Sequence, residues 1–299
     1  MYRRAARVGN LSLEVLPALG AKVVSLRYGG HPEWLAQPVR RLRVPSQPAG
    51  AWGNYDCSGW DECMPNVGAT SELPDHGMVW SREWFVSAQR DRIVASIDVA
   101  NRFQLQRELL LTDTDGVGTL VASYRIQALG DQPLRWGWAQ HPLLAADPST
   151  MIVLPEPARV RVDSAFVDGQ PVADAEWLCP GGLLAARTDL GKAHGRAAKL
   201  WFGHPLPSFV AIVRASDVLV WRIDQTSASH LGLWVNGGGW GALPRWHVAV
   251  EPSFGAHDDF DLAQRAGAGL RLHPGDTHAW RVVLQTTDKS RCELVMQYR

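Results

Sequence analysis

The sequence has no surplus of charge of either sign. Its 299 residues include 30 Lys and Arg and 30 Asp and Glu, so the formal net charge is zero. No run of five or more Lys or Arg occurs. Proteins that bind nucleic acid need a basic face to neutralise phosphates. The composition therefore predicts that nucleic acid is not a partner.

Long apolar runs are also missing. A helix needs about 18 or more apolar residues in a row to cross a bilayer, and no such stretch occurs in the sequence. We therefore expect no membrane association. The first 17 residues contain two adjacent arginines but lack the apolar segment of a signal peptide. We therefore expect a cytoplasmic protein.

Cysteine is scarce, and its spacing excludes the common cysteine motifs. The chain has four cysteines, and none of them forms a C-x-x-C pair. A zinc-finger or thioredoxin-like interpretation is therefore not supported. Four scattered thiols in a chain without an export signal are typical of a reducing compartment.

Helical periodicity is almost absent, and a two-residue period replaces it. Apolar and polar residues alternate over short segments that Gly, Pro, Asn and Asp separate. Strands are expected at Leu11–Leu16, Ala21–Tyr28, Trp84–Ala88, Arg92–Val99, Phe103–Thr112, Leu120–Ala128, Met151–Leu154, Ala198–Phe202, Phe209–Val213, Val218–Ile223, His247–Val250, His278–Leu284 and Cys292–Tyr298. Asp113–Gly116 is expected to be a hairpin turn, and Asp258–Ala266 a short helix. This pattern predicts an all-β sandwich or barrel, with residues 1–299 as a single domain.

Two segments do not have the pattern of strands. Gln47–Trp80 is repeatedly interrupted by Pro and Gly, and Val235–Leu243 reads VNGGGWGAL. Long ordered loops on a β scaffold often carry functional sites. Tryptophan is abundant, with 14 Trp against 7 Phe and 5 Tyr. Its large ring suits both protein cores and stacking on sugars, and composition alone does not separate these roles.

Three polar residues stand where their surroundings are apolar or conformationally special. His76 ends the first long loop, His141 ends an aromatic strand before a proline, and Glu251 ends an apolar strand. Each could be a structural residue. Together, two imidazoles and a desolvated carboxylate suit proton transfer near neutral pH. A His₂Glu metal site is an alternative, although no H-x-H or H-E-x-x-H element supports it.

Four segments, taken in order, resemble the aldose 1-epimerase (galactose mutarotase-like) superfamily. They are LEVLPALGAKVVSLRYGGHPEWL, then GWDECMPNVG with LPDHGMVWSREWFV, then WGWAQHPLLAADP, and finally VAVEPSFGAHDDFDLA with LHPGDTHAWRVVL. The resemblance covers roughly residues 11–285. It implies a large many-stranded antiparallel β-sandwich with a sugar cleft and a small-molecule sugar as partner. We further expect a monomer or homodimer.

The resemblance also implies roles for the three polar residues. Glu251 matches the base that takes the proton of the anomeric hydroxyl, and His141 matches the acid that protonates the ring oxygen. His76 matches the other histidine of the family, which helps to polarise the ring or the opening hydroxyl. Such ring opening needs neither a cofactor nor a metal.

Departures from the family concern substrate recognition. The arginines of the hexose-6-phosphate branch are missing at His76–Trp80 and Cys57–Trp60, so the expected sugar is unphosphorylated. Trp34, Trp60, Trp80 and Trp240 are candidates for stacking on the sugar, and Glu62, Asn66, Asp224 and Asn236 are candidates for binding its hydroxyls. Two alternatives stay open: a non-catalytic carbohydrate-binding or sensor protein on the same scaffold, and a metal-assisted lyase or isomerase that uses His76, His141 and Glu251.

Overall fold

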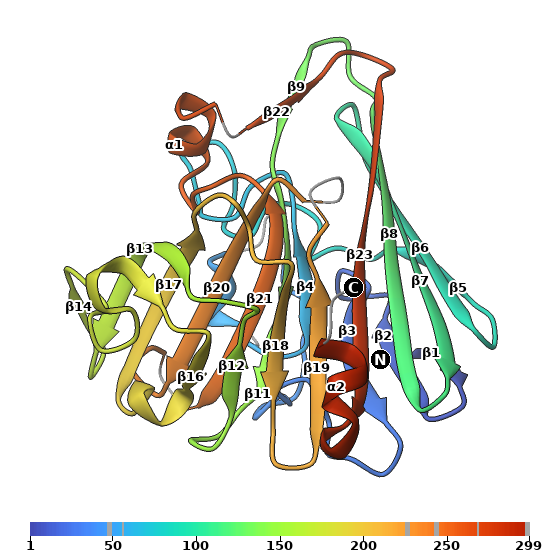
Figure 1. The fold of residues 1–299 in the computed structure, drawn as a ribbon. Coiled ribbons are helices and arrows are strands. Elements are labelled where there is room, and N and C mark those ends of the chain that lie inside the picture. Colours follow the sequence, from blue (N-terminus) through green and yellow to red (C-terminus); the bar gives the residue numbers. More distant parts are fainter. Residues whose placement is uncertain (47–49, 56, 225–227, 242–244, 268, 297–299) are drawn as a thin grey trace.

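Two large antiparallel sheets face each other in the computed structural model (Figure 1). The structure describes residues 1–46, 50–55, 57–224, 228–241, 245–267 and 269–296. Within these residues one sheet has 12 strands, a second has 9, and a small ribbon has 2. The predicted all-β sandwich is confirmed.

The twelve-stranded sheet carries the first strands of the chain at one edge. Its order is β1 (Arg4–Val8), β2 (Leu11–Leu16), β3 (Lys22–Tyr28), β4 (Trp60–Cys63), β10 (Trp138–Pro142), β21 (Trp246–Phe254), β20 (His230–Gly237), β17 (Arg196–Phe202), β13 (Ala158–Val167) and β14 (Gln170–Val172). Two short strands pair beside this path: β11 (Leu144–Ala145) with β21 and β15 (Leu183–Leu184) with β13.

The nine-stranded sheet contains the long hairpin of β7 and β8. Its order is β16 (Arg187–Asp189), β12 (Met151–Val153), β18 (Phe209–Val213), β19 (Asp217–Arg222), β23 (Thr277–Asp288), β8 (Val117–Ala128), β7 (Phe103–Thr114), β6 (Arg92–Val99) and β5 (Phe85–Ala88). The ribbon pairs β22 (Leu270–Leu272) with β9 (Leu134–Trp136). The predicted hairpin turn at Asp113–Gly116 joins β7 to β8.

Helices are short among the described residues. They are α1 (Phe260–Arg265), α2 (Cys292–Met296) and the 3-10 turns η1 (Trp52–Asn54), η2 (Pro180–Gly182), η3 (Leu190–Ala193) and η4 (Lys289–Arg291). The predicted helix is present as α1, which begins where the Asp259 side chain accepts a hydrogen bond from Leu262 N at 2.7 Å. No helix in the described part of the chain is long and apolar enough to cross a membrane.

Three sequence expectations need correction. The strand predicted at Cys292–Tyr298 is the helix α2, because Val295 packs with Cys292 and Met296 against an apolar cluster of β18 and β19; residues 297–299 lie outside the described residues. The loop expected at Gln47–Trp80 contains the strand β4, although Gln47 itself is not described. The segment Val235–Leu243 begins inside β20, and Leu243 lies outside the described residues.

Alternation along the strands decides which side chains reach the core. Successive side chains of a strand point to opposite faces of its sheet. In β21, Val248 and Val250 belong to the main core cluster, which also contains Leu105 and Leu120 of the second sheet. His247 and Glu251 therefore lie on the opposite, outer face of the twelve-stranded sheet.

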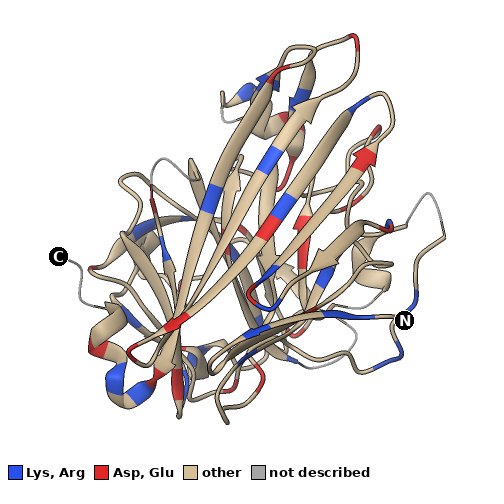
Figure 2. Ribbon diagram, turned by 90° about the vertical axis from the view of Figure 1, so that its right-hand side faces the viewer, with Lys and Arg blue, Asp and Glu red and all other residues tan. Residues whose placement is uncertain are grey.

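Charged residues of both signs are interspersed along the strands that face the viewer in Figure 2. No strand in that view carries a continuous row of one sign. The mixed pattern agrees with the zero net charge of the sequence.

Candidate active site

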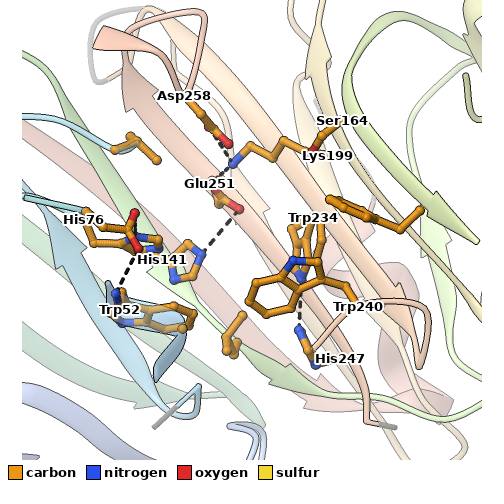
Figure 3. Close-up of a pocket in the computed structure, with 15 residues that line it drawn as sticks. Trp52, His76, His141, Ser164, Lys199, Trp234, Trp240, His247, Glu251 and Asp258 are labelled. Carbon is orange, nitrogen blue, oxygen red and sulfur yellow. Dashed lines mark hydrogen bonds and ion pairs between the residues drawn. The ribbon is translucent and has the colours of Figure 1, made fainter. Parts of the chain in front are cut away.

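A cavity of about 210 Å³ lies on the outer face of the twelve-stranded sheet (Figure 3). Its lining side chains come from five neighbouring strands, β10, β21, β20, β17 and β13, and from connecting segments that include η1 and the segment of His76. The strands form the floor of the cavity, and η1 and the segment of His76 form one wall.

The cavity brings together the three residues that the sequence singled out. His141 Nε2 lies 3.9 Å from Glu251 Oε1. The rings of His76 and His141 meet edge to face, with their centroids 4.8 Å apart. A carboxylate and two imidazoles that are 65 and 110 residues apart in the sequence thus line one pocket.

Glu251 is held by a buried lysine. Lys199 Nζ contacts Glu251 Oε2 and lies 3.4 Å from Asp258 Oδ1. Burial raises the pKa of the Glu251 carboxyl, and the Lys199 ammonium offsets part of this rise. Burial alone would lower the pKa of Lys199, but Asp258 and Glu251 raise it above its ordinary value, so Lys199 stays charged.

The surroundings of His141 favour the neutral form of its imidazole. Burial is the main cause that lowers the pKa of His141 well below its ordinary value. Electrostatic repulsion from His76 and then from Lys199 lowers it further. Two buried atoms, His141 Nδ1 and Glu251 Oε1, have no hydrogen-bond partner among the described residues. Unpaired buried polar atoms cost free energy, so such atoms at a cavity are suited to a ligand.

Asp75 orients His76. Asp75 Oδ1 lies 2.9 Å from His76 Nδ1, and Asp75 Oδ2 accepts a hydrogen bond from Trp52 N at 2.9 Å. Burial opposes ionisation of Asp75, but the hydrogen bonds from His76 and Trp52 lower its pKa overall. Because the ionised carboxylate can only accept, His76 Nδ1 carries the proton of this hydrogen bond.

The backbone at His76 is strained. His76 has φ of 60°, a left-handed conformation that is uncommon for a residue other than glycine. The next residue, Gly77, has φ of 74°, and a Cβ at this position would lie 2.1 Å from the carbonyl oxygen of Met64. Non-glycine residues held in this region cluster at functional sites.

Trp52 forms the wall beside both histidines. Its ring stacks on His76 with centroids 4.5 Å apart and meets the His141 ring edge to face at 5.0 Å. Trp52 Nε1 donates to Asp61 Oδ2 at 3.0 Å, and Asp61 also accepts from buried Lys22 Nζ at 2.7 Å. This network keeps the Trp52 ring against the imidazoles.

The opposite wall is aromatic. The rings of Trp234 and Trp240 meet edge to face with centroids 5.6 Å apart, and Trp234 Nε1 donates to His247 Nε2 at 2.9 Å. Burial lowers the pKa of His247 to about 4, so this imidazole accepts in its neutral form. Asn236 supports the wall through Nδ2, which donates to Trp240 O at 2.9 Å.

The structure corrects the expected roles of Trp34, Trp60 and Glu62. None of them lines the cavity, and all three are fully buried. Trp34 lies under the Arg214 guanidinium, whose carbon is 3.6 Å from the ring centroid. Glu62 is saturated in the core; it accepts hydrogen bonds from Trp60 Nε1, Arg107 Nη1, Tyr124 Oη and Trp138 Nε1.

Asn66, Trp80, Asn236 and Asp224 are likewise not among the residues that line the cavity. Asn66 Nδ2 donates to Gly68 O and Pro74 O, both at 2.8 Å, and so braces the loop that carries His76. Trp80 Nε1 donates to Asp75 O at 3.0 Å. These two and Asn236 support residues of the cavity, and Asp224 is half-buried. Of the eight predicted binding residues, Trp240 lines the cavity.

Several cavity residues escaped the sequence interpretation, above all Lys199, Asp75, Trp52 and Trp234. Lys199 had a usable signal, since a single charge inside the apolar run AAKLWF requires a buried partner. Among the described residues, no group of three or more His, Cys, Asp or Glu side chains is placed to hold a metal ion. The geometry therefore offers no support for the metal-assisted alternative.

Comparison with known proteins identifies the fold. No protein-family model and no curated protein matches the chain. Among solved structures, a galactose mutarotase-like protein from Lactobacillus casei has a TM-score of 0.63 at 11% identity, over 96% of this chain and 100% of that one. A galactose mutarotase related enzyme from Lactobacillus acidophilus has 0.62 at 13% identity, over 96% and 97%.

A galactose mutarotase-like protein from Clostridium acetobutylicum has a TM-score of 0.58 at 13% identity, over 97% of this chain and 98% of that one. Coverage of nearly the whole chain in each case shows that this protein has the galactose mutarotase-like fold. Identities this low establish the fold alone.

Proposed function

We propose that the protein is an isomerase of the aldose 1-epimerase type, which interconverts the anomers of an unphosphorylated sugar. The observation that carries this proposal is the pair formed by His141 and Glu251. Their nearest atoms are 3.9 Å apart in a cavity suited to one sugar ring, and each residue has a buried atom without a partner.

Ring opening needs one proton removed and one delivered. In the proposed reaction Glu251 Oε1 takes the proton of the anomeric hydroxyl while the imidazolium form of His141 gives a proton to the ring oxygen. The bond between the anomeric carbon and the ring oxygen breaks, and an open-chain aldehyde forms. Rotation about the adjacent carbon–carbon bond and the reverse proton transfers then yield the other anomer.

The environments of the two groups suit a reaction that runs both ways. Burial raises the pKa of Glu251 and lowers that of His141, so the two values move toward each other. Groups of similar pKa can exchange the roles of acid and base at little cost. The forward and reverse steps of mutarotation require this exchange.

Lys199 has a positioning role in this proposal. Its contact occupies Glu251 Oε2, and Oε1 has no hydrogen-bond partner among the described residues. The ammonium also favours the ionised form of Glu251, which is the form that accepts a proton. Trp52 and Trp240 supply flat faces for the sugar, and His76, oriented by Asp75, polarises it.

Glu251→Gln tests the proposal. The amide keeps the shape of the side chain but cannot act as a base, so we expect anomer exchange to fall by about 10²- to 10⁴-fold. Sugar affinity should stay within about tenfold, or about 1.4 kcal/mol. Proton NMR of a panel of anomerically pure sugars measures exchange, and calorimetry measures affinity. The exposed Glu72→Gln is the matched control. Exchange at the buffer rate for every sugar with the unmodified protein would refute the proposal.

A carbohydrate-binding or sensor protein is the second candidate. The observation that favours it is the close ion pair of Glu251 with Lys199, which could hold the carboxylate in a purely structural role. Calorimetric binding of a sugar without accelerated anomer exchange would select this candidate.

A further inference from the structure

Two further hollows lie beside the cavity. A second hollow of about 260 Å³ shares Gly53, Trp240 and His247 with the cavity. A third hollow of about 660 Å³ shares Arg40, Asn54 and Tyr55 with the second. The three hollows therefore lie next to one another, with Gly53, Trp240 and His247 at the boundary between the first two.

The second hollow adjoins the end of the cavity that is opposite to Lys199 and Asp258. Figure 3 shows His247 and Asp258 at opposite ends of the labelled residues, with Glu251 and His141 between them. In the proposed reaction the anomeric carbon lies at Glu251 and His141. The second hollow would then receive a unit attached to the far side of the same ring.

The charge of the two further hollows differs from that of the cavity. In the cavity, Lys199 is matched by Glu251 and Asp258. The second hollow is lined by Arg40 and Arg245, and the third by Arg40, Arg41 and Arg43. Among the described residues, no carboxylate lines either hollow. The Asp, Glu, Lys and Arg side chains described along the two hollows are therefore all arginines.

The donors of the two further hollows are suited to an anion. We call the two hollows with Arg40, Arg41, Arg43 and Arg245 the arginine groove. Arg40, Arg41 and Arg43 are exposed, and Arg245 Nη1 donates to a neutral acceptor, the carbonyl oxygen of Cys57, at 3.3 Å. Guanidinium groups bind carboxylate, sulfate and phosphate through paired hydrogen bonds.

We infer that the arginine groove binds an acidic sugar unit attached to the ring in the cavity, so that the substrate is an anionic saccharide with a free reducing end. This inference rests on the proposed function for its orientation. The ring in the cavity remains unphosphorylated, and the anionic group belongs to the neighbouring unit. Tyr55 and Trp240, which also line the groove, offer ring faces to that unit.

Matched disaccharides test the inference. The probes are neutral cellobiose and maltose, their uronate forms oxidised at C6 of the non-reducing unit, and their 6′-phosphate forms. Calorimetry at low salt should show at least tenfold tighter binding of the anionic forms. The advantage should decrease as salt screens the charges. A preference for uronates or for phosphates identifies which anion the groove recognises.

Variants locate the effect. Arg40→Gln with Arg245→Gln should abolish the preference for anionic forms and leave affinity for the neutral disaccharides within about twofold. Arg125→Gln with Arg281→Gln, at exposed positions on β8 and β23, is the control for loss of two positive charges. Equal binding of neutral and anionic probes, or a preference that survives in the double variant, would overturn the inference.

Proton NMR of anomer exchange on the same samples separates the two proposals. A preference for anionic probes without exchange supports the groove and refutes the epimerase. Exchange without such a preference supports the epimerase and refutes the groove. Neither binding nor exchange with any probe refutes both.

Discussion

Lys199 reaches Glu251 across an intervening strand. The two residues lie on β17 and β21, and β20 runs between them with Gly232 paired to Glu251. A Cβ at Gly232 would lie 3.3 Å from Lys199 Nζ and 3.4 Å from Glu251 Cβ. Because Gly232 has no side chain, the side chain of Lys199 can pass over β20 to reach Glu251.

Gly232→Val should disrupt the site while keeping the fold. Valine suits a strand, but its methyl groups would occupy the path of the Lys199 side chain. We expect kcat/KM for anomer exchange to fall at least tenfold, equivalent to about 1.4 kcal/mol. Polarimetry measures the rate, and circular dichroism checks the fold.

The same substitution in a Lys199→Met background supplies the control. If Gly232→Val acts through the lysine, the two changes are not additive, and the second costs little once the first is made. Full additivity would show that Gly232 acts in some other way.

Lys199→Met should move the acid limb of the pH profile. The pKa of Glu251 is already raised by burial, and removal of the ammonium raises it further. Since the base must be ionised, the fall of kcat/KM at low pH should shift to higher pH by about one unit or more. A purely structural lysine would lower the rate without moving this limb.

Stability of Lys199→Met should depend on pH in the direction set by Glu251. A raised pKa in the folded state means that the ionised form of Glu251 is disfavoured in the folded protein. The loss of stability in the variant is therefore largest at pH values above the folded-state pKa of Glu251. We expect a loss of about 3–5 kcal/mol in the free energy of unfolding at neutral pH. The loss should shrink as pH falls through the raised pKa and Glu251 becomes protonated. Adding Glu251→Gln should restore much of the stability but none of the activity.

The fold follows closely from local sequence pattern. Arg92–Val99, which faces the core on one side and a more polar environment on the other, is a strand with the predicted bounds. The pattern is uninformative where both faces are buried. Every residue of β4 is buried, so its sequence contains no alternation to show which side chains face the cavity.

This ambiguity explains the misplaced candidates. Trp60 and Glu62 point to the core, while Asp61 between them points to the site side and binds Trp52 Nε1. A register choice of one residue moves every side chain of a strand to the other face. Among 14 tryptophans, nothing local distinguishes Trp52, beside the histidines, from Trp34 in the core.

The three polar residues at His76, His141 and Glu251 could be recognised because each breaks a local pattern. An ionisable group at the end of an apolar strand has a desolvation cost that a partner or a ligand must offset. Lys199 breaks its apolar strand in the same way. Its partner could not be read from the sequence, because the contact spans 52 residues and a whole strand.

The pH optimum of kcat/KM should lie on the acid side of neutrality. The profile reports groups of the free enzyme, here ionised Glu251 and protonated His141. The pKa of Glu251 is raised from an ordinary 4.5, and that of His141 is lowered from an ordinary 6.5. The acid limb therefore moves up and the alkaline limb moves down, so the pH range of activity is narrower than these ordinary values would give. A maximum above pH 7 would exclude the imidazolium of His141 as the proton donor.

Asp75→Asn should move the imidazole proton of His76 from Nδ1 to Nε2. Asp75 now accepts from both His76 Nδ1 and Trp52 N. An asparagine that keeps the bond from Trp52 N must turn its amide NH₂ toward His76 Nδ1, which then accepts and moves the imidazole proton to Nε2. We expect kcat to fall by about 10²-fold or more, because loss of acid–base help costs about 10²- to 10⁴-fold. KM should change little, since the shape of the cavity is kept.

His76→Asn is the companion variant, because asparagine tolerates the left-handed backbone at this position. If His76 acts through its oriented ring, the double variant should be no slower than His76→Asn alone, whereas additive losses would assign Asp75 a separate role.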